Sequence, residues 1–157
     1  MISKGVQALA LGGWLALCFA AAATGIFVST GDWYAALNKP SWNPPAWVFG
    51  PAWTFLYVTM AIAAWLVWRE GGWNAQRRTL GLFIVQWFLN ALWTPLFFGL
   101  HRPGVAFAEI TLLWLAIAAT LVTFWRVKKA AGLLLVPYFA WVSFAATLNF
   151  TIWRLNS

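Results

Sequence analysis

Five apolar stretches, each about 20 residues long, divide this sequence and constrain its fold more than any other feature. They cover approximately residues 6–28, 46–68, 79–100, 104–126 and 132–153. A helix of about 20 residues crosses the roughly 30 Å hydrocarbon core of a bilayer. The connections are short, so residues 1–157 are predicted to form a single domain. We therefore expect an all-α integral membrane protein built as one bundle of five transmembrane helices.

The basic residues between these stretches predict how the bundle is oriented. The sequence has 10 Lys and Arg residues against 3 Asp and Glu residues. The side that carries the N-terminus would hold the larger group, which is Lys4, Arg69, Arg77, Arg78, Arg126, Lys128 and Lys129. The opposite side would hold Lys39, Arg102 and Arg154. Because positive residues are enriched in cytoplasmic loops, we expect a cytoplasmic N-terminus. Since these charges flank helices, we expect lipid headgroups and no nucleic acid as their partners.

Residues 29–45 form the one long connection and are rich in aromatic residues and proline. Asp32 is expected to cap a short helical turn that Pro40 stops. Trp33 and Tyr34 give this turn an apolar side that can lie on the bundle. We therefore predict an ordered lid between the first two spans. In the alternative interpretation these rings belong only to an interfacial aromatic belt, to which the 14 Trp residues of the chain would also contribute.

Polar and aromatic side chains recur at helical spacing inside three of the spans. One face of the third span carries Gln86, Asn90, Trp93 and Phe97. Similar stripes are Trp53 and Tyr57 in the second span and Tyr138, Trp141, Ala145 and Leu148 in the fifth. Amides are costly in contact with lipid, so these faces should point inward. We predict one aromatic-walled pocket with a few amides. The alternative is plain packing, in which Gln86 and Asn90 bond to neighbouring helices.

Side chains that carry hydrolytic or metal chemistry are scarce. His101 is the only histidine and Cys18 the only cysteine, so neither a catalytic triad nor a cluster of metal ligands can be assembled. We expect no metal site and no required cofactor. Glu109 is the one acidic residue inside an apolar stretch, and we expect a structural role in which it reaches the interface or pairs with Arg102.

Short motifs rich in Trp, Pro and Asn recur along nearly the whole chain. The first half contains Trp33-Tyr34, Lys39-Pro40-Ser41-Trp42, Pro44-Pro45, Trp47-Val48, Gly50-Pro51, Trp53 and Leu56-Tyr57. The second half contains Asn90-Ala91-Leu92-Trp93, Pro95, Phe97-Phe98-Gly99, Pro137-Tyr138, Trp141 and Ala146-Thr147-Leu148-Asn149-Phe150. Together these motifs resemble the signature of the translocator protein family, which includes the tryptophan-rich sensory proteins and peripheral benzodiazepine receptors. We expect a bacterial member, located in the cell envelope.

The resemblance implies a homodimer and a cavity under the first loop. This cavity would accept porphyrins, such as protoporphyrin IX or haem, and isoquinoline or benzodiazepine ligands. By position, it would be formed by Thr24, Tyr34, Trp53, Asn90, Trp93, Trp141 and Ala145. We add Lys39, whose ammonium group is expected to pair with a porphyrin propionate. In some bacterial members, light-dependent breakdown of protoporphyrin is attributed to two tryptophans that match Trp53 and Trp141.

A sterol motif of the family would fall on Leu148, Phe150 and Arg154. Phe150 stands where the motif has Tyr, so the hydroxyl group of the motif is missing, and the motif itself is a weak pattern.

Three functions follow from these features. The favoured one is binding of a porphyrin or other tetrapyrrole in the pocket for sensing, sequestration or transport. The second is light-dependent degradation of protoporphyrin, with Trp53 and Trp141 as catalytic residues. The third is transport of a sterol or another membrane lipid.

Overall fold

A computed structural model of the chain describes all residues except 1, 26–27 and 29–30. Within this described part, five helices are long and apolar enough to cross a membrane: Lys4–Gly25, Ala46–Trp68, Arg77–Gly99, Pro103–Val127 and Lys129–Leu155. The predicted all-α bundle with five membrane spans is confirmed. The second span begins and ends where the sequence predicted. The first was predicted to continue to residue 28, but residues 26 and 27 lie outside the described part.

Three of the spans combine two helical types. Helix α1 (Lys4–Ala20) continues as the 3₁₀ turn η1 (Ala21–Gly25), and the 3₁₀ turn η2 (Ala46–Val48) leads into α3 (Phe49–Trp68). Helix α5 (Arg77–Thr94) ends in a π-helical turn, η3 (Pro95–Gly99). Helices α6 (Pro103–Val127) and α7 (Lys129–Leu155) are each continuous, and two short helices, α2 (Gly31–Ala36) and α4 (Gly72–Ala75), lie in connections.

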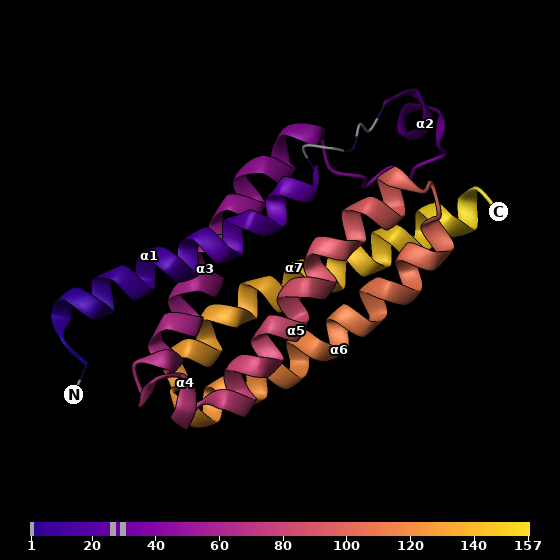
Figure 1. Cartoon of the computed structure of the whole chain (residues 1–157). Coiled ribbons are helices and arrows are strands. Elements are labelled where there is room, and N and C mark those ends of the chain that lie inside the picture. Colours follow the sequence, from indigo (N-terminus) through magenta and orange to yellow (C-terminus); the bar gives the residue numbers. More distant parts are fainter. Residues whose placement is uncertain (1, 26–27, 29–30) are drawn as a thin grey trace.

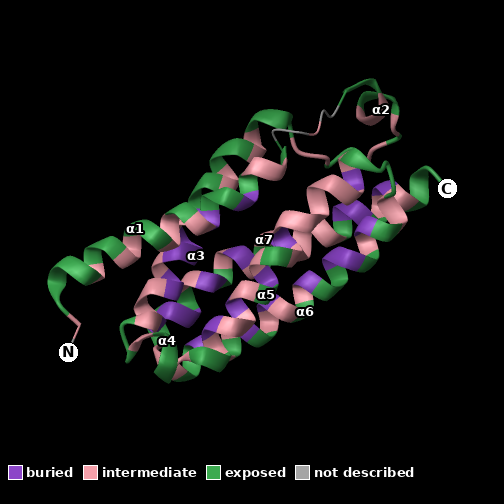
Figure 2. Cartoon of the chain, in the orientation of Figure 1, coloured by how far each residue is buried: buried purple, intermediate pink, exposed green. Residues whose placement is uncertain are grey.

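The helices are arranged as a bundle with one peripheral member. Helices α5, α6 and α7 run side by side, α3 packs on α7, and α1 packs along the outer side of α3 (Figure 1). Buried residues lie on the inward faces of α3, α5, α6 and α7, whereas α1 is almost entirely exposed or half-buried (Figure 2). Cys18 is the only buried residue of α1. Helix α2 lies at the end of the bundle opposite the N-terminus, near the C-terminus (Figure 1).

Two indole groups attach α1 to the bundle. The Trp65 indole donates a hydrogen bond of 2.8 Å to the Gln7 carbonyl oxygen, and the Trp87 indole donates one of 2.7 Å to the Leu17 carbonyl oxygen. Where α1 changes into η1, the Ala21 N–H bonds to the Cys18 carbonyl, three residues earlier, and not to that of Leu17. The switch to 3₁₀ geometry therefore frees the carbonyl group that Trp87 uses.

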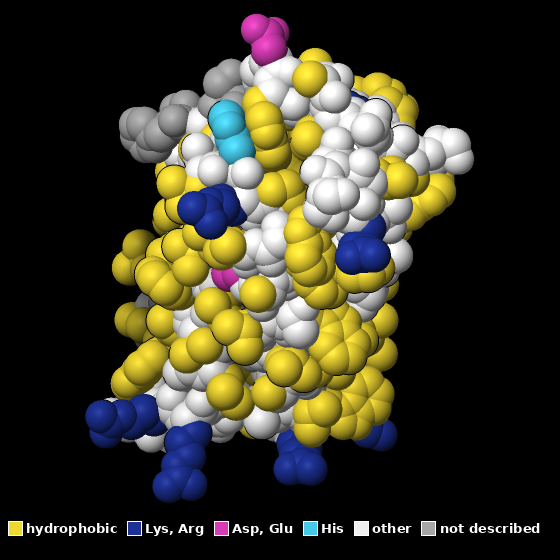
Figure 3. Space-filling view, turned by 90° about the vertical axis from the view of Figure 1, so that its right-hand side faces the viewer, with side chains coloured by type: hydrophobic (Ala, Val, Ile, Leu, Met, Phe, Trp, Pro, Cys, Tyr) yellow, Lys and Arg dark blue, Asp and Glu magenta, His cyan; other side chains and the backbone are white. Residues whose placement is uncertain are grey.

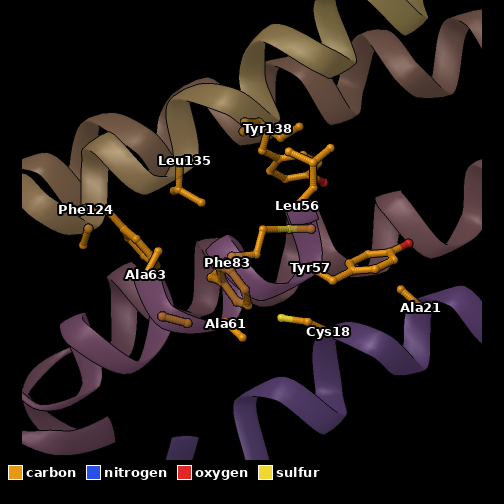
Figure 4. Close-up of a cluster of buried hydrophobic side chains, with 14 of the residues drawn as sticks. Cys18, Ala21, Leu56, Tyr57, Ala61, Ala63, Phe83, Phe124, Leu135 and Tyr138 are labelled. Carbon is orange, nitrogen blue, oxygen red and sulfur yellow. The ribbon is translucent and has the colours of Figure 1, made fainter. Parts of the chain in front are cut away.

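The core lies where α3 meets its neighbours. Figure 4 shows small side chains of α3, among them Ala61 and Ala63, beside the larger rings of Phe83 and Phe124. Both alanines are fully buried. Small side chains let helix backbones approach closely, which is the usual packing of transmembrane helices.

The basic side chains lie mainly at one end of the bundle. On the face shown in Figure 3, Lys and Arg side chains gather at the lower end, and hydrophobic side chains cover most of the surface above them. This is the distribution expected of a protein with a lipid-facing belt. The compartment that this basic end faces stays a prediction from the positive charges.

The tight turn between α6 and α7 provides a test of the packing. A Cβ atom on Gly132 would lie 2.8 Å from both Cα and Cβ of Trp125, whereas one on Gly81 would meet nothing within 4 Å. Gly132→Ala should therefore lower the free energy of unfolding by about 1–3 kcal/mol through overpacking. Gly81→Ala, the matched control, should raise it by up to about 1 kcal/mol because Ala favours the helix. Thermal unfolding in detergent measures both, and equal effects would contradict the close approach.

Candidate ligand-binding site

One cavity of about 630 Å³ lies inside the bundle beneath the lid. All five spans contribute to its wall, and Tyr34, Asn43 and Pro44 from the connection between the first two spans also line it. The volume lies within the range of pockets that hold drug-sized ligands. Most of the lining is apolar or aromatic, and Asn90 and Asn149 are among its few polar side chains. The cavity is therefore suited to a largely apolar molecule with a small number of polar groups.

The structure brings most of the predicted binding residues together around this cavity. Those that line it are Thr24, Tyr34, Trp53, Asn90, Trp93, Trp141 and Ala145. The rings of Trp53 and Trp141 lie 6.5 Å apart and nearly perpendicular, at 84°. Tyr57, from the stripe on the second span, also lines the cavity, with its ring 5.5 Å from that of Trp53. That these residues bind a ligand stays a prediction.

Lys39 is the one predicted binding residue that does not line the cavity. Its ammonium group donates hydrogen bonds to the carbonyl oxygens of Tyr34, at 2.8 Å, and Leu37, at 3.1 Å. It also lies 4.7 Å from the centre of the Tyr34 ring. Lys39 thus satisfies carbonyl groups at the C-terminal end of α2. Pairing with a propionate, which stays a prediction, would require it to leave these partners.

The predicted ordered lid is confirmed for the described residues 31–45 and rests on aromatic contacts. Trp33 stacks on His101 at 4.3 Å, Tyr34 contacts Phe98, and Trp42 contacts Phe144. The side chain of Asn156, after α7, exchanges two hydrogen bonds of 2.9 Å with the backbone of Asn38. One detail was wrong: α2 begins at Gly31, so Asp32 lies in its first turn and does not precede it as a cap.

A chain of hydrogen bonds lies at the inner end of the cavity. The Tyr57 hydroxyl donates to Asn90 Oδ1 at 3.3 Å, Asn90 Nδ2 donates to the Tyr138 hydroxyl at 2.9 Å, and this hydroxyl donates to Gln86 Oε1 at 2.7 Å. Asn90 and Tyr57 line the cavity, whereas Tyr138 and Gln86 lie behind them. Both interpretations of the amide stripe therefore hold in part: Asn90 faces the pocket, and Gln86 bonds to a neighbouring helix.

Sequence reasoning missed several residues of the cavity wall, and Asn149 and Phe98 show two reasons for it. Asn149 accepts a hydrogen bond of 2.8 Å from the Trp93 indole and donates one of 2.8 Å to the Pro103 carbonyl. The cost of an amide in lipid, applied to the fifth span, could have identified it. Phe98 lines the cavity together with its neighbour Phe97. The π-helical turn that begins at Pro95 changes the helical spacing there, so a regular α-helical stripe does not include Phe98.

Glu109 makes neither of the contacts expected for it, while its structural role stays a prediction. Its side chain is buried on α6, and neither carboxylate oxygen has a hydrogen-bond partner among the described residues. The one ion pair of the described residues joins Lys128 to Glu70 at 3.3 Å, so Glu109 does not pair with Arg102. Within the same part of the chain, no three His, Cys, Asp or Glu side chains come together in a way that could hold a metal ion.

The three residues of the sterol motif do not share one surface. Leu148 is buried and lines the cavity. Phe150 is 42% exposed and packs against Phe107, with 5.2 Å between ring centres. Arg154 is exposed. Leu148 and Phe150, two residues apart on the helix, point in different directions. Of the three motif residues, only Leu148 can therefore contact a molecule in the cavity.

Comparison with known proteins identifies the family. The model of the TspO/MBR family matches residues 14–154. The chain belongs to the TspO/MBR family. It is similar to protein CrtK of Rhodobacter capsulatus, with 48% identity over 141 residues that make up 88% of each chain. It is also similar to the tryptophan-rich sensory protein of Cereibacter sphaeroides, with 45% identity over 143 residues, 91% of this chain and 89% of that one.

A similar relationship extends to the human translocator protein. Its identity to this TspO/MBR family member is 45% over 126 residues, 79% of this chain and 75% of the human one. The family and the five apolar helices together establish an integral, multi-pass membrane protein. The resemblance recognised in the sequence is therefore confirmed.

Proposed function

We propose that this membrane protein binds a tetrapyrrole, or another flat apolar molecule of similar size, in the cavity beneath the lid. The observation that supports this most directly is a cavity of about 630 Å³ with Trp53, Trp93 and Trp141 in its wall. Indole rings provide large, flat, apolar surfaces on which aromatic ligands stack. A binding protein of this kind serves sensing, sequestration or transport of the ligand. The homodimer implied by the resemblance stays a prediction.

The two perpendicular indoles give the pocket its shape selectivity. Because the Trp53 and Trp141 rings meet at 84°, a planar ligand stacked on one ring presents its edge to the other, and both stacked and edge-to-face contacts are favourable. The Asn90 amide supplies a polar contact near these rings. Tyr34 lines the cavity on the side of the lid, and a polar contact among such apolar walls is stronger than the same contact in water.

The test is a titration of the purified protein with protoporphyrin IX in the dark, followed by tryptophan quenching. The wild type is compared with the double variant Trp53→Phe, Trp141→Phe. Binding should be saturable in the wild type and about tenfold weaker in the double variant, because two aromatic contacts worth about 0.5–1.5 kcal/mol each are diminished. The control is Trp47→Phe, Trp73→Phe, which removes two indoles that are 74% and 45% exposed.

Two results would contradict the proposal. One is quenching that does not saturate, which indicates partition into detergent. The other is equal affinity in the wild type and in the double variant of the cavity, which indicates binding elsewhere.

Light-dependent degradation of protoporphyrin is a second candidate, because two oxidisable indoles, Trp53 and Trp141, line the same cavity. The test is illumination in air of the wild type and of the single variants Trp53→Phe and Trp141→Phe. Loss of product in single Trp→Phe variants that still bind the porphyrin supports an enzyme. Unchanged product yield in both single variants contradicts a catalytic role for these two indoles.

A further inference from the structure

Gln86 is fully enclosed and does not touch the cavity, yet it is bonded to a residue that does. It is 1% exposed and Tyr138 is 0% exposed. The Tyr138 hydroxyl connects Gln86 Oε1, at 2.7 Å, with Asn90 Nδ2, at 2.9 Å. In Figure 4, Tyr57 on α3 and Tyr138 on α7 direct their hydroxyl oxygens toward the same end of the bundle. The four side chains form one continuous chain of hydrogen bonds from the cavity into the core.

The Tyr138 hydroxyl couples the two amides because it carries a single proton. That proton goes to Gln86 Oε1, so the Tyr138 oxygen accepts from Asn90 Nδ2. The opposite order of hydrogen bonds exists only if both amides turn over: Tyr138 would then donate to the Asn90 oxygen and accept from the Gln86 amino group. Asn90 therefore cannot turn its oxygen toward Tyr138 while Gln86 Oε1 holds the Tyr138 proton, unless a hydrogen bond is lost.

The direction of these hydrogen bonds determines which atom of the Asn90 amide faces a ligand. With Nδ2 bonded to Tyr138, the Asn90 oxygen lies on the side of Tyr57, which lines the cavity. An amide oxygen accepts two hydrogen bonds, and Tyr57 uses one of them at 3.3 Å. The remaining lone pair is available to an N–H or O–H group of a molecule in the cavity.

At the inner end of this chain of hydrogen bonds, one donor group of Gln86 has no partner. Gln86 Nε2 is buried and has no hydrogen-bond partner among the described residues. A buried donor without a partner is costly, typically by about 1–3 kcal/mol. In return for this cost, the amide supplies an oxygen that accepts the Tyr138 proton and so holds it away from Asn90. Leucine at position 86 would remove both the unmet donor and the acceptor.

We propose that Gln86 is a specificity-determining residue: through Tyr138 it fixes the Asn90 amide with its oxygen toward the cavity, and so selects ligands that carry an N–H or O–H donor. Gln86 acts as a positioning residue, since it touches no ligand. The inference rests on the proposed function, because it concerns molecules bound in the same cavity.

The test uses rigid aromatic probes that differ in one group. Carbazole carries one N–H donor, and fluorene is its isostere without a donor. Acridine carries one ring-nitrogen acceptor, and anthracene is its isostere without one. Each probe competes with protoporphyrin IX in the quenching assay. The ratio of affinities within each pair is divided by the same ratio in Asn90→Leu, which removes differences in partition into detergent.

The wild type should favour carbazole over fluorene by about tenfold, the effect of one hydrogen bond of about 1.4 kcal/mol. In Gln86→Leu the Tyr138 proton turns to the Asn90 oxygen and the amino group faces the cavity. The advantage of carbazole should then disappear, and acridine should gain about tenfold over anthracene. In a Tyr138→Phe background the connection is absent, so adding Gln86→Leu should change neither ratio.

Several results would overturn the inference. These are equal affinities for carbazole and fluorene in the wild type, unchanged ratios in Gln86→Leu, or the same change of ratio with and without Tyr138. A general loss of packing would weaken all four probes alike and leave the ratios unchanged. If Gln86→Leu does not fold, Tyr138→Phe alone must lower the carbazole ratio. Failure of the proposed function is recognised separately, because protoporphyrin itself would then not bind saturably to the wild type.

Discussion

Ala145→Phe is expected to weaken protoporphyrin binding by about 100-fold or more while the protein stays folded. Ala145 lines the cavity between Trp141 and Asn149, one turn from each. A phenyl ring at this position would occupy space that a ligand needs, and an overlap that costs about 3 kcal/mol corresponds to a loss of about 100-fold. Because the ring enters an existing cavity and displaces no buried atoms, we expect little change in stability. Dark titration and thermal unfolding measure the two effects.

The matched control is Ala140→Phe, on the same helix. Ala140 is exposed and lines an outer groove of about 350 Å³ between α3 and α7, which shares Trp141 with the cavity. This variant should bind protoporphyrin as the wild type does. If Ala140→Phe abolished binding and Ala145→Phe did not, the ligand would occupy the outer groove, and the proposed site would be wrong.

Asn149→Leu is expected to destabilise the protein more than the overpacking variant Gly132→Ala. Asn149 is 2% exposed and connects Trp93 on α5 with Pro103 at the start of α6. Leucine has a similar size but cannot bond to either group. The Trp93 N–H would lose its acceptor inside the bundle and the Pro103 carbonyl would lose a donor, so the free energy of unfolding should fall by about 2–4 kcal/mol.

Asn156→Leu is the matched control for Asn149→Leu, because it also removes two hydrogen bonds to a distant segment but does so at an exposed position. Both of these bonds go to the backbone of Asn38. Water can replace these bonds, so the loss should stay below about 1 kcal/mol. Unfolding in detergent, followed by circular dichroism, compares the two variants. Equal losses would show that burial does not set the cost at Asn149.

The spans could be predicted from the sequence because apolar length is a strong signal in a membrane protein. Their ends were less predictable. The fifth span was expected over 132–153, but α7 runs from Lys129 to Leu155. Backbone hydrogen bonds continue a helix beyond the hydrocarbon into its basic and polar ends, whereas the apolar pattern stops at the interface. The end of the apolar pattern therefore underestimates the length of the helix.

The cavity wall was predictable where helices are regular. The spacing of Asn90 and Trp93 places them on one face, and the structure has both in the wall. Prediction failed where local backbone geometry decides. Phe98 enters the wall through a π-helical turn. Lys39 is held by the carbonyl groups at the end of its own short helix. Neither effect leaves a periodic signal in the sequence.

The way α1 is attached has a consequence for how this protein can evolve. The indoles of Trp65 and Trp87 bind carbonyl oxygens of the α1 backbone, and every residue type provides such an oxygen. Added side chains would also meet no obstacle at Gly5, Gly12 or Gly13. Mutations along the outer face of α1 can therefore accumulate without detaching the helix, provided that the segment stays apolar and helical. Selection can in this way reshape the lipid-facing side of the molecule without changing the cavity.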